Sequence, residues 1–265
     1  MSSDQLKEHL AFASELGVEG VSRDPVWRHR DDRSQSDDVS AVRPTRRDGP
    51  SDSGDAGGLD MGDNDKSTPA GEPLKLAKSA AEVLASIRTE IGPDCSRCKL
   101  HRLGRTQVVF GVGHPEARLM FVGEAPGADE DDQGIPFVGR AGQLLTKIIE
   151  AIDLTRDQVY IANVIKCRPP GNRNPEPEEV EKCTPFLKQQ IGLIQPKLVI
   201  AMGRFAAQTL LGSDASIASL RGKVYSYEGV PLIVTYHPAY LLRNLPDKAK
   251  AWADLVFAKK TMATL

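Results

Sequence analysis

The stretch ARLMFVGEAPG, residues 117–127, indicates the architecture of this chain more clearly than any other. It begins as a short apolar run, which is typical of a buried strand, and passes directly into a loop rich in glycine and proline. Comparable apolar runs recur further along the chain. We therefore expect strands at residues 117–122, 159–164, 198–202 and 232–235.

Helical periodicity occupies the intervals between and after these runs. It predicts helices at residues 75–91, 140–151, 176–193, 204–211 and 247–262. Strands that alternate with helices are typical of a mainly parallel sheet. The sequence thus predicts a three-layer α/β/α fold with a mainly parallel central sheet, whose functional loops leave the carboxyl ends of the strands.

The bulk composition is that of a globular protein. The chain has 265 residues and a formal net charge of −2, and its 40% hydrophobic content is enough to build at least one core. Its apolar runs are shorter than the roughly 18 to 20 residues that span a bilayer. The first residues, MSSDQLKEHL, lack a signal-peptide pattern. We expect a cytoplasmic protein that does not enter a membrane.

The charged residues are unevenly distributed along the chain. Residues 1–73 hold 16 acidic and 9 basic side chains, whereas residues 74–265 hold 20 acidic and 25 basic ones. The C-terminal part therefore has a net charge of +5. This balance suits a polyanionic partner such as DNA, although it is also common among proteins that never bind nucleic acid.

The composition divides the chain into three segments. In residues 1–22, apolar side chains recur at helical spacing and predict a short amphipathic helix. This helix is either a frayed tail or a tethered element that docks on a partner protein. Residues 23–73, which are rich in Asp, Ser, Gly and Pro, predict a disordered acidic linker. Residues 74–265 are the expected folded domain.

The chain contains four cysteines, Cys95, Cys98, Cys167 and Cys183. A disulfide framework is not expected in a reducing compartment. The close pair Cys95 and Cys98, together with two distant cysteines, predicts one shared thiolate site that suits either zinc or an iron–sulfur cluster. The spacing does not choose between these metals, and four separately buried cysteines are the alternative.

The loops after the predicted strands have unusual sequences. GEAPG at residues 123–127 and GIPFVGRAG at residues 134–142 are rich in glycine, which lets backbone amides approach a ligand closely. The second loop also opens a helix, whose first turn can bind a phosphate. After the last strand, HPAYLLRN at residues 237–244 places His237 at a strand end before a proline. A histidine in this position favours a functional role over a structural one.

The motifs GEAPG, GIPFVGRAGQLL, YIANVIKCRPPGNRNP and HPAYLLRN, with the C-x2-C ahead of them, closely resemble the family 4 uracil-DNA glycosylases. This family is the bacterial and archaeal iron–sulfur branch of its superfamily, and the resemblance covers about residues 85–260. It implies a 4Fe-4S cluster on the four cysteines, with zinc the less favoured metal. It also implies a monomeric, nucleoid-associated bacterial enzyme of base excision repair.

The resemblance implies that the substrate is uracil-containing DNA, single- or double-stranded. Such an enzyme flips the uracil nucleotide out of the DNA, hydrolyses its N-glycosidic bond and leaves an abasic site. By resemblance, Phe137 stacks on the flipped base and the amide of Asn163 reads its pyrimidine edge. His237 donates a hydrogen bond to the uracil carbonyl as negative charge develops there. Glu124 orients the attacking water or stabilises the cationic sugar, with Asn172 as a helper.

Gly123, Ala125 and Glu130 complete the predicted pocket. Glu130 is the alternative to Glu124 as the residue that orients the water. The better-known uracil glycosylases have an aspartate just after the residue that matches Glu124, where this chain has Ala125. A strong carboxylate base is therefore missing from that point of the chain.

Binding DNA also requires phosphate contacts and a side chain that fills the vacated base stack. We expect Arg140, Arg204 and Arg243 at phosphates, and Leu241 as the inserted wedge. The acidic pair at residues 131–132 is interpreted as part of a solvated surface loop.

Three other functions match parts of the sequence. A relative that traps uracil-DNA covalently would need a histidine in the loop around residues 165–183, where none occurs. A non-catalytic DNA-binding or polymerase-associated module of the same fold is disfavoured because Glu124, Asn163 and His237 occur together. A zinc hydrolase would need an open coordination position, whereas four cysteines fill a tetrahedral shell.

Overall fold

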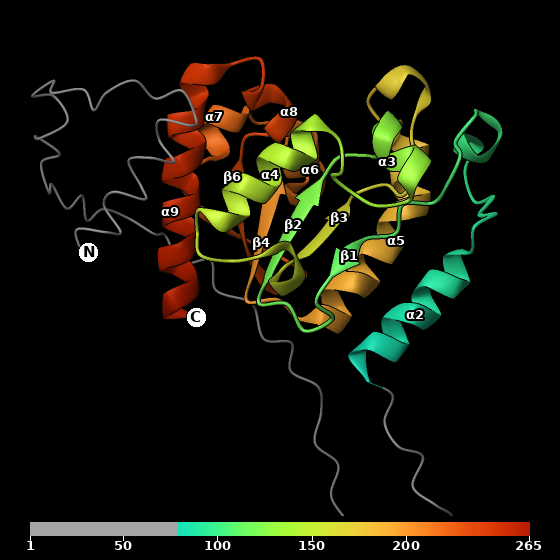
Figure 1. Ribbon diagram of the computed structural model, residues 1–265, viewed down its shortest axis with the longest axis horizontal. Helices are drawn as coiled ribbons and strands as arrows, with labels where there is room; N and C mark the ends of the chain where they lie inside the picture. Colours follow the sequence, from blue (N-terminus) through green and yellow to red (C-terminus); the bar gives the residue numbers. More distant parts are fainter. Residues whose placement is uncertain (1–78) are drawn as a thin grey trace, which may run out of the picture. The chain divides into compact units, whose positions relative to one another are not determined.

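The computed structural model describes residues 79–265. The helix predicted at residues 1–22 and the linker predicted at residues 23–73 lie outside the described residues, as does the start of the helix predicted at residues 75–91. The described part of the chain is built around one sheet with helices on both faces (Figure 1).

The sheet has six strands in the order β1-β3-β2-β4-β6-β5. Their bounds are Val112–Gly113 for β1, Leu119–Gly123 for β2, Tyr160–Asn163 for β3, Leu198–Met202 for β4, Val224–Tyr227 for β5 and Val230–Thr235 for β6. The inner strands β3, β2, β4 and β6 run parallel, whereas β1 and β5 pair antiparallel at the two edges. The predicted mainly parallel sheet is confirmed.

The four inner strands are those that the apolar runs predicted, with small shifts at their ends. The edge strands β1 and β5 were missed. β1 is only two residues long, and β5 alternates between exposed and half-buried residues. An edge strand of this kind is covered on fewer sides than a central one, so its sequence lacks the continuous apolar run that identified the others.

The helices fill the predicted intervals. The long ones are α2 (Ala80–Ile91), α4 (Arg140–Glu150), α5 (Pro177–Ile194), α6 (Arg204–Leu211) and α9 (Lys248–Thr264). Short helices follow or precede the strands: α3 (Ala128–Gln133), α7 (Ile217–Leu220) and α8 (Pro238–Leu241). Single 3-10 turns occur at η2 (Lys99–Arg102), η3 (Arg156–Gln158), η4 (Pro170–Asn172) and η5 (Leu245–Asp247).

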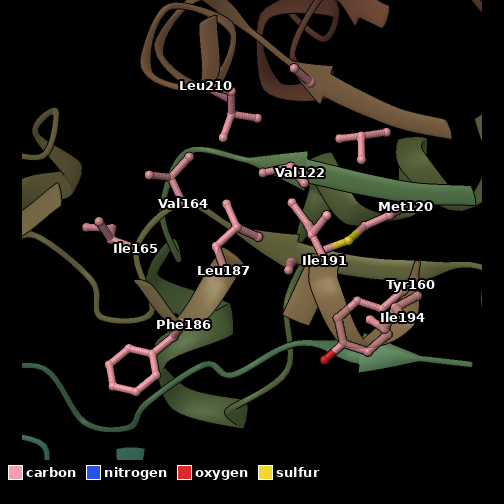
Figure 2. Packing of buried hydrophobic residues seen from close by; sticks show 14 of the residues in the cluster. Met120, Val122, Tyr160, Val164, Ile165, Phe186, Leu187, Ile191, Ile194 and Leu210 are labelled. Atoms are coloured by element: carbon pink, nitrogen blue, oxygen red, sulfur yellow. The ribbon is translucent and has the colours of Figure 1, made fainter. Parts of the chain in front are cut away.

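The core is divided between the two faces of the sheet. On β2, Met120 and Val122 point to one face, whereas Leu119 and Phe121 point to the other, because successive side chains of a strand alternate. The first face is covered by α2, α5 and α6, and Figure 2 shows side chains of that cluster. The second face is covered by α4 and α9. The predicted three-layer α/β/α arrangement is therefore confirmed.

The acidic stretch after β2 differs from the expected solvated loop. It forms α3, and Asp131 is only 2% exposed. Its carboxylate accepts hydrogen bonds from the backbone N–H of Thr106 at 2.9 Å and of Gln107 at 3.3 Å. The predicted loop was wrong for both residues, which lie in α3. The predicted solvation was wrong for Asp131, because its partners lie far away in the sequence, and right for the exposed Asp132.

None of the helices within residues 79–265 is both long and apolar enough to cross a bilayer.

Candidate active site

A pocket of about 400 Å³ opens where the inner strands end. β2 ends at Gly123, which pairs with Asn163 at the end of β3, and β6 ends two residues before His237. Parallel strands present their carboxyl ends at one edge of a sheet, so these residues from distant parts of the chain converge there. The pocket is lined by eight residues that the sequence predicted: Glu124, Ala125, Glu130, Phe137, Asn163, Asn172, His237 and Arg243.

Asn163 supplies a buried acceptor that has no partner. The residue is 1% exposed. Within the described part of the chain, its Oδ1 is the one buried side-chain nitrogen or oxygen that lacks a hydrogen bond. Leaving such a group unsatisfied costs about 1–3 kcal/mol. Since this atom lies at a pocket, a ligand with a matching N–H donor would recover that free energy.

Gly123 allows the side chains of the pocket floor to meet. A Cβ at this position would lie 2.5 Å from Asn163 Oδ1 and 2.5 Å from Phe137 Cζ. Phe137 has a φ of +55°, and a Cβ at Gly142 would lie 1.9 Å from the Phe137 carbonyl oxygen. The two glycines therefore let the Phe137 ring lie against Asn163.

His237 is held as a neutral hydrogen-bond donor. Its Nδ1 accepts from the backbone N–H of Ala239 at 3.1 Å, which assigns the imidazole proton to Nε2. Burial, helped by the positive charge of Arg243, lowers the pKa of His237 to about 4. The imidazole is thus uncharged at neutral pH, and its ring centroid lies 5.6 Å from that of Phe137.

Gly203, at the end of β4, supports His237 from behind. Its φ is +90°, and a Cβ there would lie 2.8 Å from the Cβ of His237. Its N–H donates to the carbonyl of Thr235 at 2.8 Å. The β4 and β6 ends are thereby joined directly beside the histidine.

The two predicted glutamates have different environments. Burial raises the pKa of the Glu124 carboxyl, an effect that the positive charge of Arg204 opposes. Glu130 instead accepts three backbone N–H groups, from Gly127 at 3.1 Å, Val138 at 2.9 Å and Gly139 at 3.0 Å. The Glu130 carboxylate therefore joins the two glycine-rich loops, and it is less available than Glu124 to orient a water molecule.

The loop after β3 forms one wall of the pocket. Asn172 has a φ of +54°, and its Oδ1 accepts from Arg168 Nε at 2.8 Å. Next to it, Arg173 forms two hydrogen bonds with the fully buried Glu179, at 2.6 and 2.9 Å. Arg173 and Glu179 were not predicted. The charged residues that follow the prolines of this loop, at 173–179, could have indicated an ion pair. The sequence does not show which of these charges pair.

The residues expected to contact DNA differ in their positions relative to the pocket. Arg243 is exposed and lines the pocket, whereas the exposed Arg140 and Arg204 begin α4 and α6 outside the lining. Leu241 is only 1% exposed and packs in a core cluster, so the structure does not place it as a wedge. The exposed leucine that follows on the same segment is Leu245, at 52%.

The four cysteines come together on the side of the domain that α2 and α5 cover. Burial raises the pKa of Cys167 to about 11 and of Cys183 to about 12. The thiols of Cys98 and Cys167 also raise the pKa of Cys183, and those of Cys98 and Cys95 raise that of Cys167, so the four groups lie within electrostatic reach of one another.

Hydrogen-bond donors face two of these sulfurs. Arg105 Nη1 lies 2.9 Å from Cys167 Sγ, and the backbone N–H of Lys166 lies 3.2 Å from Cys183 Sγ. In the part of the chain that the structure describes, no three His, Cys, Asp or Glu side chains are placed to hold a single metal ion.

Comparison with known proteins identifies similar uracil-DNA glycosylases. Residues 110–256 match the model of the uracil DNA glycosylase superfamily. A type-4 uracil-DNA glycosylase of Archaeoglobus fulgidus is 49% identical over 169 residues, which cover 61% of this chain and 84% of that protein. Those of Sulfurisphaera tokodaii and Thermotoga maritima are 48% and 47% identical, over 61% and 64% of this chain and 76% and 88% of the relatives.

Proposed function

We propose that this chain, which belongs to the uracil DNA glycosylase superfamily and to its type-4 branch, removes uracil from DNA by hydrolysing the N-glycosidic bond. It is a DNA-repair hydrolase. The observation that carries the assignment is the unpartnered, buried Oδ1 of Asn163 in a pocket that also holds a neutral His237.

The amide of Asn163 selects uracil by its hydrogen-bonding pattern. Oδ1 accepts from the N3–H of uracil, and the amide N–H donates to its O4. Cytosine has a lone pair at N3 and an amino group at position 4. Two acceptors would then face each other at N3, and two donors at position 4. A buried mismatch of this kind can exclude a base by several orders of magnitude. Phe137 stacks on the face of the base.

His237 stabilises the departing base. As the bond between C1′ and N1 breaks, its electron pair moves onto the uracil ring and negative charge develops at O2. The Nε2–H of the neutral imidazole donates to this oxygen. A donor that is already in place contributes about 3 kcal/mol in such sites. Because its low pKa keeps His237 neutral, the residue stabilises the departing anion by hydrogen bonding rather than as an imidazolium acid.

Glu124 acts on the sugar side of the bond. Its carboxylate stabilises the positive charge that develops at C1′ and orients the water whose oxygen bonds to C1′. The proton of that water passes to the carboxylate, whose raised pKa makes it a better acceptor than an ordinary glutamate, and then to solvent. Asn172, which lines the same pocket, assists in holding the water.

Contacts to DNA come from the rim of the pocket. Arg243, Arg204 and Arg140 bind phosphates, and their exposure supports this role. The side chain that replaces the flipped base in the stack is Leu245 rather than the buried Leu241.

The four cysteines suit a 4Fe-4S cluster better than zinc. The motifs around the cysteines resemble those of the iron–sulfur branch of the family, which favours the cluster. The thiols perturb one another's pKa, which supports one shared site. The N–H donors at Cys167 and Cys183 are partners typical of cluster thiolates. When bound, the cluster supplies a cross-link between chain segments.

An excision assay tests the function. The purified chain is incubated with an oligonucleotide that contains one uracil, and strand cleavage is measured after alkali treatment. We expect cleavage at the uracil, with His237→Ala and Asn163→Ala each slower by about 10²-fold or more. The exposed Leu103, which does not line the pocket, provides a control variant, Leu103→Ala, at the wild-type rate. The absence of an alkali-labile site from both single- and double-stranded substrates would refute the proposal.

A further inference from the structure

A buried charge lies next to the base-reading residue, and the mechanism above does not use it. Lys166, three residues after Asn163, is 1% exposed. Its Nζ donates to the carbonyl oxygen of Asn163 at 2.9 Å and to Gln190 Oε1 at 2.7 Å. Lysine is rarely buried so completely without a carboxylate partner, and no ion pair joins Lys166 to a carboxylate of the described residues. Both of its acceptors are neutral.

Gln190 continues this contact into the core. It is fully buried on α5, and its Nε2 donates to the carbonyl of Phe110 at 3.0 Å and to the hydroxyl of Tyr160 at 3.1 Å. Tyr160 begins β3 and Asn163 ends it, so one glutamine connects both ends of this strand to the helix. Figure 2 shows Tyr160 among the side chains of the core cluster to which α5 contributes. A polar network with these bonds satisfied is rigid.

The backbone of Lys166 is fixed as well. Its N–H donates to Cys183 Sγ at 3.2 Å, and its carbonyl accepts from the N–H of Val109 at 2.7 Å. Cys183 and Gln190 both belong to α5, so this helix holds Lys166 by the main chain and by the tip of the side chain. The remaining contact of the ammonium group is the carbonyl of Asn163.

Asn163 depends on such support because no hydrogen bond holds its Oδ1. Within the described residues this oxygen has no partner, and the neighbouring contacts at Gly123 and Phe137 are those of packing. A small rotation of the residue would turn the amide away from the base edge. The direction of the amide therefore depends on the backbone of Asn163, which is held by its pairing with Gly123 of β2 and by the hydrogen bond that Lys166 donates to its carbonyl oxygen.

We propose that Lys166, anchored by Gln190, is a positioning residue that fixes Asn163 for uracil recognition and connects it to α5. This inference rests on the proposed function. Its effect is on the geometry of the base-reading amide and not on DNA binding, since neither Lys166 nor Gln190 lines the pocket. It gives α5, which carries Cys183, a direct connection to substrate selection.

Two variants test the proposal. Lys166→Met removes the charge and both bonds of the ammonium group. Gln190→Met keeps the lysine and removes its anchor, and it decides the question if Lys166→Met does not fold. Ile191→Ala is the matched control, because Ile191 is buried on the same helix next to Gln190 but belongs to the apolar core. It reports the effect of lost stability alone.

The measurements are the single-turnover excision rate at saturating enzyme, the affinity for an undamaged oligonucleotide, and the side-chain amide NMR signal of Asn163. For both methionine variants we expect the excision rate to fall at least about 10-fold, because a misplaced contact slows the reaction. The affinity for the undamaged oligonucleotide stays unchanged, and the Asn163 amide signal shifts or broadens. The uracil-over-cytosine preference falls in parallel. Ile191→Ala keeps the signal and the preference.

Methionine variants that retain the wild-type rate, base preference and amide signal would overturn the inference, as would losses that match those of Ile191→Ala. A wild-type chain that releases no uracil refutes the proposed function instead. In that case the Asn163 amide signal still reports whether Lys166 and Gln190 position the residue.

Discussion

The two side chains proposed to contact the base are prepared in opposite ways. His237 has one ring nitrogen satisfied by the backbone of Ala239, which leaves a defined N–H on the other nitrogen. Asn163 has an oxygen with no hydrogen-bond partner among residues 79–265. The first arrangement fixes a donor for a charge that appears only during the reaction. The second favours a ligand that brings its own N–H, because binding then removes an unsatisfied buried group.

The pKa of His237 predicts how stability depends on pH. Its folded pKa is about 4, below the ordinary value of 6.5, so between these values the unfolded chain binds the proton and the folded chain does not. Stability therefore falls as the pH is lowered from about 6.5 to 4. His237→Gln lacks this titration, so we expect the wild type to lose stability relative to the variant over that range. Denaturant unfolding at several pH values measures the difference, and parallel curves would contradict it.

Gly123 predicts an effect of one added methyl group. In Gly123→Ala the Cβ would lie 2.5 Å from both Asn163 Oδ1 and Phe137 Cζ, so these groups must move by about 1 Å, a displacement that can cost about 10²-fold in rate. Gly192→Ala on α5 is the control, because a Cβ there meets no atom within 4 Å. Alanine also favours the helical conformation more than glycine does. We expect it to keep the wild-type excision rate and to gain stability slightly. Equal rates for the two variants would contradict the prediction.

At the scale of elements, the loops at the strand ends are held by bonds that cross between them. Glu130 on α3 accepts from the loop before it and from the loop that leads to α4. On α8, the hydroxyl of Tyr240 donates to Asp247 at 2.6 Å, and Asn244 Nδ2 donates to the carbonyl of Tyr240 at 3.0 Å. The segment between Tyr240 and Asp247 is therefore closed at its base, with Leu245 exposed on it.

Leu245 on this closed segment predicts that excision from double-stranded DNA and excision from single-stranded DNA respond differently to its loss. If Leu245 fills the vacated stack, Leu245→Ala loses an insertion worth about 1.5–3 kcal/mol, and excision from double-stranded DNA slows by about 10-fold or more. Excision from single-stranded DNA, where no stack needs filling, stays unchanged. Single-turnover rates on both substrates measure this.

Leu103→Ala, at another exposed leucine, is the control for Leu245→Ala. Leu241→Ala is expected to lower stability by about 2–5 kcal/mol, because the leucine is buried. An equal loss of rate on the two DNA forms in Leu245→Ala would argue against the wedge.

At the scale of the whole molecule, the cysteines connect segments that are distant in sequence. Cys95 and Cys98 follow α2, Cys167 follows β3, and Cys183 lies on α5. A cluster bound by all four would fasten the pocket wall that contains Asn172 to the helical layer over the sheet. The monomeric state of the protein, its association with the bacterial nucleoid and a protein partner for residues 1–22 remain predictions.

The cluster predicts a spectroscopic and a stability result. The purified chain should be brown and contain about four iron atoms per molecule. Cys183→Ser should lose iron and melt at a lower temperature than the wild type. Thermal unfolding with and without a chelator, and metal analysis, measure these effects without reference to activity. A colourless protein that contains one zinc ion per chain would reject the cluster and indicate a zinc site.

The sequence by itself determined the inner strands, the long helices and the residues at the strand ends, because apolar runs and helical periodicity are local signals. It also predicted Asn163 and His237, which the structure brings to one pocket, and a shared metal site on the four cysteines, since motifs preserve residue type and order. Only the tertiary structure showed that Leu241 is buried, that Glu130 is occupied by backbone donors, and that Lys166 joins the backbone of Asn163 to Gln190 of α5. Burial and hydrogen-bond partners depend on residues far apart in the chain, and no local pattern records which of them will meet.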